Sequence, residues 1–329
     1  MNEDYRYLIK SIFKLEKLSD PSFIQGSKKY NHTKTPVLPT SYKKRPYVIY
    51  KAIKSGKPVV VKILLRKNYK LFFARELFVI QNLGKLIPQS DKYLPELISF
   101  GLHPAPYFII RFYSASEPMG NYNLLIADLP AGTLTELVGA IETLHLNRLE
   151  FEQKIAGLKL RSPFVNTEPY NFYISRFFQE TKKYLVKMFG LAKTTRLQEL
   201  FKQSKKAFTN SPEYFCWGDA NPANVLYNKN TGKFIFIDFE KAGYSYPARD
   251  FTTLYYSIYL KDPKFAEHYV ALLKQKFTDT DFWQIFYFKL LIYSFPRQFR
   301  YFKEQNEYLK QKKIVSCAKL TEKEYINYF

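Results

Sequence analysis

The sequence predicts an α+β fold in two lobes, a small lobe rich in β-strands followed by a larger helical lobe. Strand-like runs of β-branched and aromatic residues are concentrated before residue 130, and apolar residues at helical spacing dominate after it. The chain has 329 residues, of which 46% are hydrophobic, so it can bury one large core or two smaller ones. We place the lobe boundary between 128 and 129, giving lobes of 1–128 and 129–329.

The small lobe is expected to hold a β-sheet and few helices. Apolar spacing predicts an opening helix over residues 4–18 and a second helix over 69–86. Alternation and turn residues predict strands at 47–53, 58–65, 107–113 and 123–127. The first two form a hairpin about residues 54–57. This order puts Lys62 inside a strand and Glu76 in the middle of the helix that follows it.

The large lobe is expected to be mostly helical. It begins after a turn at 129–132, and a short strand pair lies between Asp219 and Asp238. Helical spacing of apolar residues predicts helices at 133–146, 171–189, 195–208, 249–260, 263–277 and 281–302.

Three oxygen-bearing side chains stand at informative spacing in the large lobe. Asp219 precedes Asn224 by five residues, and Asp238 follows the predicted strand 234–237. Transfer of a phosphoryl group needs a carboxylate to orient the attacking hydroxyl and oxygen ligands for a metal ion. Asp and Asn also serve as ordinary turn caps, and each residue alone would be read that way. Together they favour a phosphotransfer site.

The segments Trp217-Gly218-Asp219-Ala220-Asn221-Pro222-Ala223-Asn224 and Ile237-Asp238-Phe239-Glu240 resemble the aminoglycoside phosphotransferase and choline kinase family, whose motifs read HGDxxPxN and IDFE. The resemblance spans about residues 47–260. It implies a protein kinase-like fold and transfer of the γ-phosphate of ATP, with Mg²⁺, to a hydroxyl group of a small molecule.

The resemblance also assigns roles to individual residues. It implies Asp219 as the catalytic base, Asn224 and Asp238 as Mg²⁺ ligands, and Asp250 as a buried carboxylate that braces the catalytic loop. Glu240 is expected near the metal as a possible acceptor contact.

Four further residues are expected to bind the nucleotide. Lys62 stands where a kinase places the lysine that contacts the α- and β-phosphates, and Glu76 is its natural ion-pair partner. Arg75 is a rival partner for Glu76. The adenine is expected against the hinge near Asp128 and Leu129.

Two departures from the family pattern lead to an alternative function. Trp217 stands where the family has His, and no glycine occurs between Gly26 and Tyr47, where a phosphate-covering loop is expected. The alternative is a weak or inactive kinase-like scaffold that binds a nucleotide or an anionic partner.

The acceptor is left open among amino alcohols, aminoglycosides and sugar-like molecules. Tyr244 and Tyr246 follow the metal motif, and a ring-rich segment at 283–295 could form a cage for a quaternary amine. Aromatic residues at helical spacing are more often core, and core is the favoured interpretation.

The formal net charge of +22 also admits nucleic acid or an anionic surface as a partner. Fourteen basic residues and no acidic ones lie from Lys28 to Arg75, although solvated lysines are the simpler explanation. Cys216 and Cys317 are expected to be packing residues, and the four scattered histidines suggest no metal site. No apolar run reaches membrane-spanning length, so we expect a cytoplasmic protein of unspecified oligomeric state.

Overall fold

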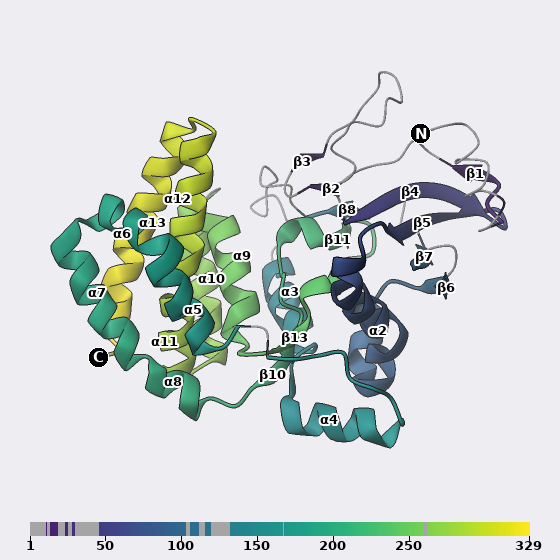
Figure 1. Cartoon of the computed structure of the whole chain (residues 1–329), viewed down its shortest axis with the longest axis horizontal. Helices are drawn as coiled ribbons and strands as arrows, with labels where there is room; N and C mark the ends of the chain where they lie inside the picture. Colours follow the sequence, from purple (N-terminus) through teal and green to yellow (C-terminus); the bar gives the residue numbers. More distant parts are fainter. Residues whose placement is uncertain are drawn as a thin grey trace.

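The computed structural model describes residues 11, 14–18, 24–25, 28–29, 46–102, 106–111, 116–119, 132–166, 168–259 and 262–329. An antiparallel five-stranded sheet in the order β1-β4-β5-β7-β6 occupies one side of the molecule (Figure 1). Its strands are β1 (Lys17–Leu18), β4 (Tyr47–Lys54), β5 (Lys57–Leu64), β6 (Leu97–Gly101) and β7 (Tyr107–Arg111). The small pair β2 (Ile24–Gln25) and β3 (Lys28–Lys29) forms a separate two-stranded sheet.

The hairpin β4–β5 shows how the sequence pattern builds the sheet. Tyr47 pairs with Leu64 and Lys54 with Lys57, so the eight residues of each strand are in full register. Successive side chains of a strand point to opposite faces. One face buries a set of mostly β-branched apolar side chains, which comprises Val48, Tyr50, Ala52, Val59, Val61 and Ile63. The other face carries Lys62 and Leu64.

Helix α2 (Lys70–Leu86) covers that second face. Leu64 of β5 and Phe108 of β7 share a buried cluster with Phe73 and Ile80 of the helix. The 3₁₀ turns η2 (Lys67–Tyr69) and η3 (Pro88–Tyr93) precede and follow the helix. As a result, Lys62 faces the helix that bears Glu76 instead of solvent.

Two three-stranded sheets lie between the large sheet and the helices (Figure 1). One has the order β13-β10-β9 and the other β12-β11-β8. Their strands are β8 (Glu117–Pro118), β9 (Leu146–Asn147), β10 (Tyr214–Cys216), β11 (Val225–Asn228), β12 (Lys233–Phe236) and β13 (Gly243–Ser245). The 3₁₀ turns η6 (Pro222–Asn224) and η7 (Phe239–Lys241) lie in the segments that carry the predicted motif.

Helices make up the rest of the described chain. They are α3 (Thr133–Glu142), α4 (Arg148–Gly157), α5 (Tyr170–Arg176), α6 (Lys182–Phe189), α7 (Leu191–Gln203), α8 (Lys205–Asn210), α9 (Ala248–Tyr259), α10 (Pro263–Lys276), α11 (Thr280–Lys289), α12 (Phe295–Glu304) and α13 (Tyr308–Ile326). Two π-helical segments, η5 (Phe177–Thr181) and η8 (Leu290–Ser294), join α5 to α6 and α11 to α12. One large cluster of buried side chains connects these helices with α2 and the short sheets.

Most of the predicted elements are confirmed, with shifted ends. The helix predicted over 133–146 ends at Glu142, because the chain then turns into β9, and the helix predicted over 195–208 is the pair α7 and α8. Strand β6 and helices α4 and α13 were not predicted. The predicted strand 123–127, most of the predicted helix 4–18 and the boundary at 128 and 129 lie outside the described residues. The prediction of helix is wrong at residues 17–18, which form strand β1 because they pair with β4. Among the described helices, none is long and apolar enough to span a membrane.

Candidate active site

Lys62 connects the sheet to the motif segment. Its ammonium Nζ lies 2.6 Å from Glu76 Oε2 and 3.4 Å from Asp238 Oδ1. Burial disfavours the charged form of Lys62, but these two carboxylates raise its pKa above the ordinary value. The predicted pair of Lys62 with Glu76 therefore exists. Arg75 instead donates from Nε to the Pro163 carbonyl, at 3.3 Å.

The loop after β10 carries Asp219 and is shaped by the two residues before it. Gly218 has φ of +86°, and a Cβ at this position would lie 2.3 Å from the Lys241 carbonyl oxygen. Only glycine fits such a close approach without displacing backbone. Trp217 is fully buried and packs against Phe236 and Phe239, with ring centroids 4.8 and 5.6 Å away. The tryptophan thus supports the loop by packing.

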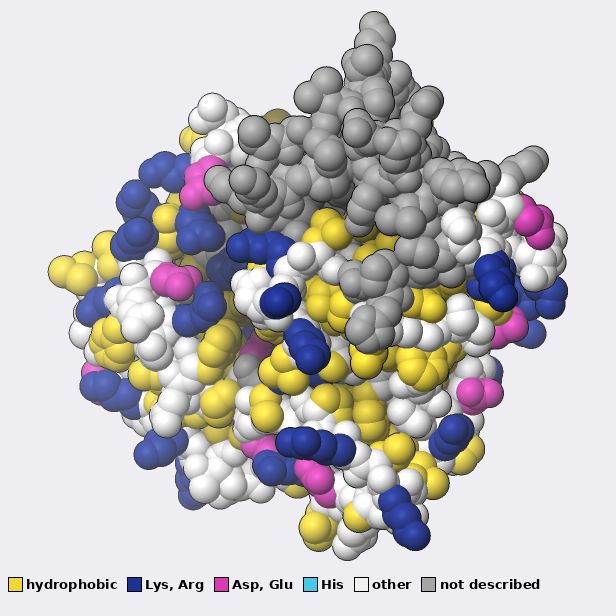
Figure 2. Space-filling model, turned by 45° about the vertical axis from the view of Figure 1, so that its right-hand side comes forward, with side chains coloured by type: hydrophobic (Ala, Val, Ile, Leu, Met, Phe, Trp, Pro, Cys, Tyr) yellow, Lys and Arg dark blue, Asp and Glu magenta, His cyan; other side chains and the backbone are white. Residues whose placement is uncertain are grey.

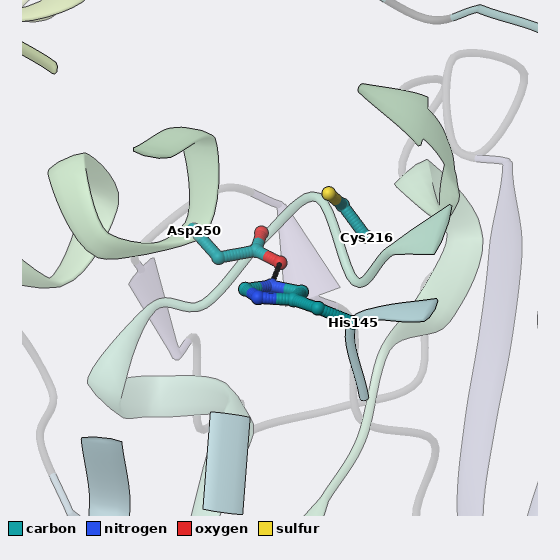
Figure 3. A group of neighbouring side chains, drawn as sticks. All are labelled: His145, Cys216 and Asp250. Atoms are coloured by element: carbon teal, nitrogen blue, oxygen red, sulfur yellow. Dashed lines mark hydrogen bonds and ion pairs between the residues drawn. The ribbon is translucent and has the colours of Figure 1, made fainter. Parts of the chain in front are cut away.

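Asp250, in the first turn of α9, fixes the backbone of this loop. Its Oδ2 accepts from the Trp217 N–H at 2.9 Å and its Oδ1 from the Gly218 N–H at 2.7 Å. His145 Nε2 lies 3.0 Å from Oδ2 (Figure 3). Burial opposes ionisation of Asp250, but the hydrogen bond and charge of His145 and the charge of Arg249 hold its pKa below the ordinary value.

Cys216 lies beside this pair, so that His145, Cys216 and Asp250 offer donor atoms within 4.8 Å of one another (Figure 3). Both oxygens of Asp250 already accept hydrogen bonds from the loop. Burial, and then the Asp250 charge, raise the pKa of the Cys216 thiol, which disfavours the thiolate that binds metals. The geometry is that of a brace for the loop.

Asp219 forms an ion pair that the sequence did not predict. Lys241 Nζ lies 2.6 Å from Asp219 Oδ2, and the lysine side chain is 47% exposed. Burial raises the pKa of Asp219, while the Lys241 charge pulls it down. Asn224 Nδ2 donates to the Asp219 carbonyl oxygen at 3.1 Å, which ties the two ends of the motif together. In the sequence, the only indication that Lys241 belongs to the site is its position directly after the segment 237–240.

Asp238 and Glu240 add negative charge next to this pair. Asp238 has a left-handed backbone with φ of +63°, uncommon for a residue other than glycine, and its side chain is partly exposed. Burial, together with the Asp238 charge, raises the pKa of Glu240. A cation beside these carboxylates would relieve their repulsion.

A second cluster of buried charges surrounds Glu168 and reaches the backbone of Lys241. Glu168 lies 3.2 Å from Arg249 Nε and 3.4 Å from Lys289 Nζ, and it accepts a hydrogen bond from the Tyr173 hydroxyl. Arg249 also donates to the carbonyl oxygen of Lys241, at 3.3 Å. Lys289 was visible in the sequence as a charge inside an apolar run, but its partners belong to distant elements.

The ring-rich segment forms core and not a cage. Five of its rings, those of Trp283, Phe286, Tyr287, Phe288 and Phe295, are at most 3% exposed. Tyr244 and Tyr246 are buried as well, and the Tyr246 hydroxyl donates to the Phe208 carbonyl oxygen. The favoured prediction of packing is confirmed for these residues. Asp128 and Leu129, predicted to contact the adenine, lie outside the described residues.

Similarities to known proteins concern the family and the fold of the chain. The family model of the phosphotransferase enzyme family matches residues 53–285, a range that contains Lys62, Asp219 and Asp238. No curated protein sequence matches significantly. Similar solved structures include the GDP and kanamycin complex of APH(2")-IIIa, at 15% identity and a TM-score of 0.60 over 100% of both chains.

Two other similar structures have different acceptors. One is the spectinomycin phosphotransferase APH(9)-Ia with ADP and spectinomycin, at 13% identity and a TM-score of 0.55, covering 96% of this chain and 98% of the other. The second is macrolide 2'-phosphotransferase type I, at 13% identity and a TM-score of 0.56, covering 96% of both chains. At such low identity these similarities establish the fold alone.

Proposed function

Because the chain belongs to the phosphotransferase enzyme family, we propose that it transfers the γ-phosphate of ATP to a hydroxyl group of a small molecule. The observation that carries this proposal is the contact of Lys62 with both Glu76 and Asp238, which lie on segments far apart in the chain. It brings a phosphate-binding cation and a metal-binding carboxylate together beside Asp219.

In the proposed reaction Asp219 orients the acceptor hydroxyl and accepts its proton as the oxygen attacks the γ-phosphorus. The bond from the γ-phosphorus to the bridging oxygen breaks, and ADP leaves. General-base catalysis of this kind contributes about 10²–10⁴-fold. Lys62, held by Glu76, binds the α- and β-phosphates. Lys241 lies close enough to Asp219 to favour its ionised form and to contact the transferred phosphoryl group. Asp250 and His145 are positioning residues, because they act on the loop backbone.

The residues present fit a magnesium ion. Asp238 supplies a carboxylate, and Asn224, whose amide nitrogen is used within the loop, keeps its side-chain oxygen for a cation. Hard oxygen ligands of this kind suit Mg²⁺, with phosphate oxygens and waters completing the shell. When bound there, Mg²⁺ would neutralise charge on the phosphates. Glu240 is a candidate contact for the acceptor, which we propose to be an amino alcohol, an aminoglycoside or a sugar-like molecule.

Replacing Asp219 tests this function. We expect Asp219→Ala to lower kcat at least about 10²-fold in a screen of amino alcohols, aminoglycosides and sugars with labelled ATP. Circular dichroism and calorimetry with Mg·ATP should show an intact fold and nucleotide binding. Unchanged turnover in the variant would rule out the proposed base. Nucleotide binding by the unmodified protein without transfer to any acceptor would favour the scaffold alternative.

A further inference from the structure

Helices α6 and α12 carry five basic side chains on neighbouring exposed surfaces. Lys183 and Lys187 lie one turn apart on α6, and Arg297, Arg300 and Lys303 follow at three-residue spacing on α12. Residues at these spacings share one face of a helix. We call these five residues the basic stripe. The opposite face of α12 is buried through Phe295, Phe299 and Phe302.

The two helices are held together under the stripe. The ring of Tyr184 on α6 contacts the ring of Phe299 on α12, with centroids 6.5 Å apart. On the surface, the side chain of Lys303 lowers the pKa of Lys187, first as a hydrogen-bond partner and then through its like charge, because the two ammonium groups lie close together. The packing therefore fixes like charges next to each other.

Within the part of the chain that the structure describes, Lys183, Lys187, Arg297 and Lys303 form no ion pair with a carboxylate, and Arg300 lies 3.7 Å from Glu304. Several exposed lysines elsewhere do have such partners, namely Lys202 with Glu199, Lys274 with Glu324 and Lys276 with Glu142. Basic side chains, dark blue in Figure 2, outnumber the magenta acidic ones over the face in view, as the net charge of +22 predicts. Apart from the contact of Arg300 with Glu304, the stripe is thus a concentrated positive surface without carboxylate partners among the described residues.

Exposed apolar side chains lie at both ends of α6. Phe178, in the preceding π-helical segment, is 54% exposed, and Leu191, just after Gly190, is 65% exposed. Basic residues flanked by exposed aromatic and aliphatic side chains are typical of surfaces that bind at a lipid interface. Contacts to nucleic-acid phosphates have no need of the exposed leucine.

We propose that the basic stripe, with Phe178 and Leu191, docks this protein onto an anionic lipid bilayer. The lysine and arginine side chains would lie at the phosphate headgroups and the two apolar side chains would enter the interface. This surface is separate from Asp219 and the other site residues, and its role does not depend on the proposed reaction.

Vesicle binding tests the proposal with a matched pair of variants. Each basic residue near an anionic surface contributes about 1 kcal/mol, so Lys187→Glu with Lys303→Glu should weaken sedimentation with phosphatidylglycerol-containing vesicles at least about tenfold. Lys205→Glu with Lys206→Glu on α8 changes the net charge equally. These exposed residues lie at the other end of the helical part (Figure 1), and their replacement should change binding less than about twofold.

Three further binding measurements distinguish an anionic bilayer from RNA as the partner. Pure phosphatidylcholine vesicles should bind neither the unmodified protein nor the variants. Phe178→Ser with Leu191→Ser should reduce vesicle binding and leave any binding of a single-stranded RNA probe unchanged. Asp219→Ala should bind vesicles as the unmodified protein does, whatever its activity. Equal losses in the two charge-reversal variants would overturn the proposal, and so would RNA binding that is tighter than vesicle binding and depends on the stripe.

Discussion

The ion pair of Asp219 with Lys241 should set the pH range in which Asp219, the base that we propose, can work. Asp219 must be ionised to accept a proton, so activity falls as the pH drops through its pKa. Burial raises that pKa, and the ammonium group of Lys241, 2.6 Å away, opposes the rise. The acid limb of the pH profile should therefore lie above that of an exposed aspartate.

Removing the charge of Lys241 should shift this limb in a known direction. In Lys241→Gln the carboxylate of Asp219 loses its counter-charge, its pKa rises further, and the acid limb of kcat/KM should move to higher pH. The control is Lys229→Gln, an exposed lysine of the turn between β11 and β12, which should leave the profile in place. A limb that does not move in Lys241→Gln would show that another group is titrating.

At the scale of elements, the buried carboxylate of Glu168 links its loop to α9 through Arg249 and to α11 through Lys289. Burial opposes the charge on Glu168, but the two cations lower its pKa from 4.5 to about 2. A depressed carboxyl pKa contributes stability that is fully present above the unfolded value and is lost as the pH falls towards the folded value. For Glu168 that window runs from about pH 4.5 down to about pH 2.

Glu168→Gln should uncouple these elements. The amide keeps the shape but leaves Arg249 and Lys289 buried without their counter-charge, which should lower the free energy of unfolding by about 3 kcal/mol at neutral pH. Urea unfolding across the acid range should also show a flatter pH dependence below pH 4.5 in the variant. As a control, Glu199→Gln breaks the exposed pair with Lys202 and should cost less than about 1 kcal/mol. Equal losses in both variants would contradict the linking role.

Sequence patterns predicted the features that depend on residues close together in the chain. The alternation of residues 58–65 located β5, and the spacing of Asp219, Asn224 and Asp238 located the motif segment. Strand β6 was missed because Leu97–Gly101 is short and ends in glycine, and α13 because its residues are mostly polar. The ion pair of Lys241 with Asp219 and those of Glu168 could not be predicted, since they form only when separate segments of the chain fold together.

At the scale of the whole molecule, two electrostatic fields of opposite sign coexist. The chain carries a formal charge of +22, yet four carboxylates gather at the site against Lys62 and Lys241. These are Glu76, Asp219, Asp238 and Glu240. The local excess of acid suits a divalent cation, whereas the global field attracts anions from a distance. The two fields act over different ranges, because salt screens charges more than about 8–10 Å apart.

The long-range field should control how fast the nucleotide arrives. The association rate constant of a fluorescent ATP analogue with Mg²⁺, measured by stopped flow, should fall several-fold as the salt concentration rises from about 0.02 to 0.3 M. The corresponding fluorescent adenosine analogue, which lacks phosphates, should show almost no salt dependence and serves as the control ligand. A rate for the ATP analogue that rises with salt would mean that the acidic site, and not the overall positive charge, dominates the approach. In that case a cationic acceptor such as an aminoglycoside would be the one that electrostatics favours.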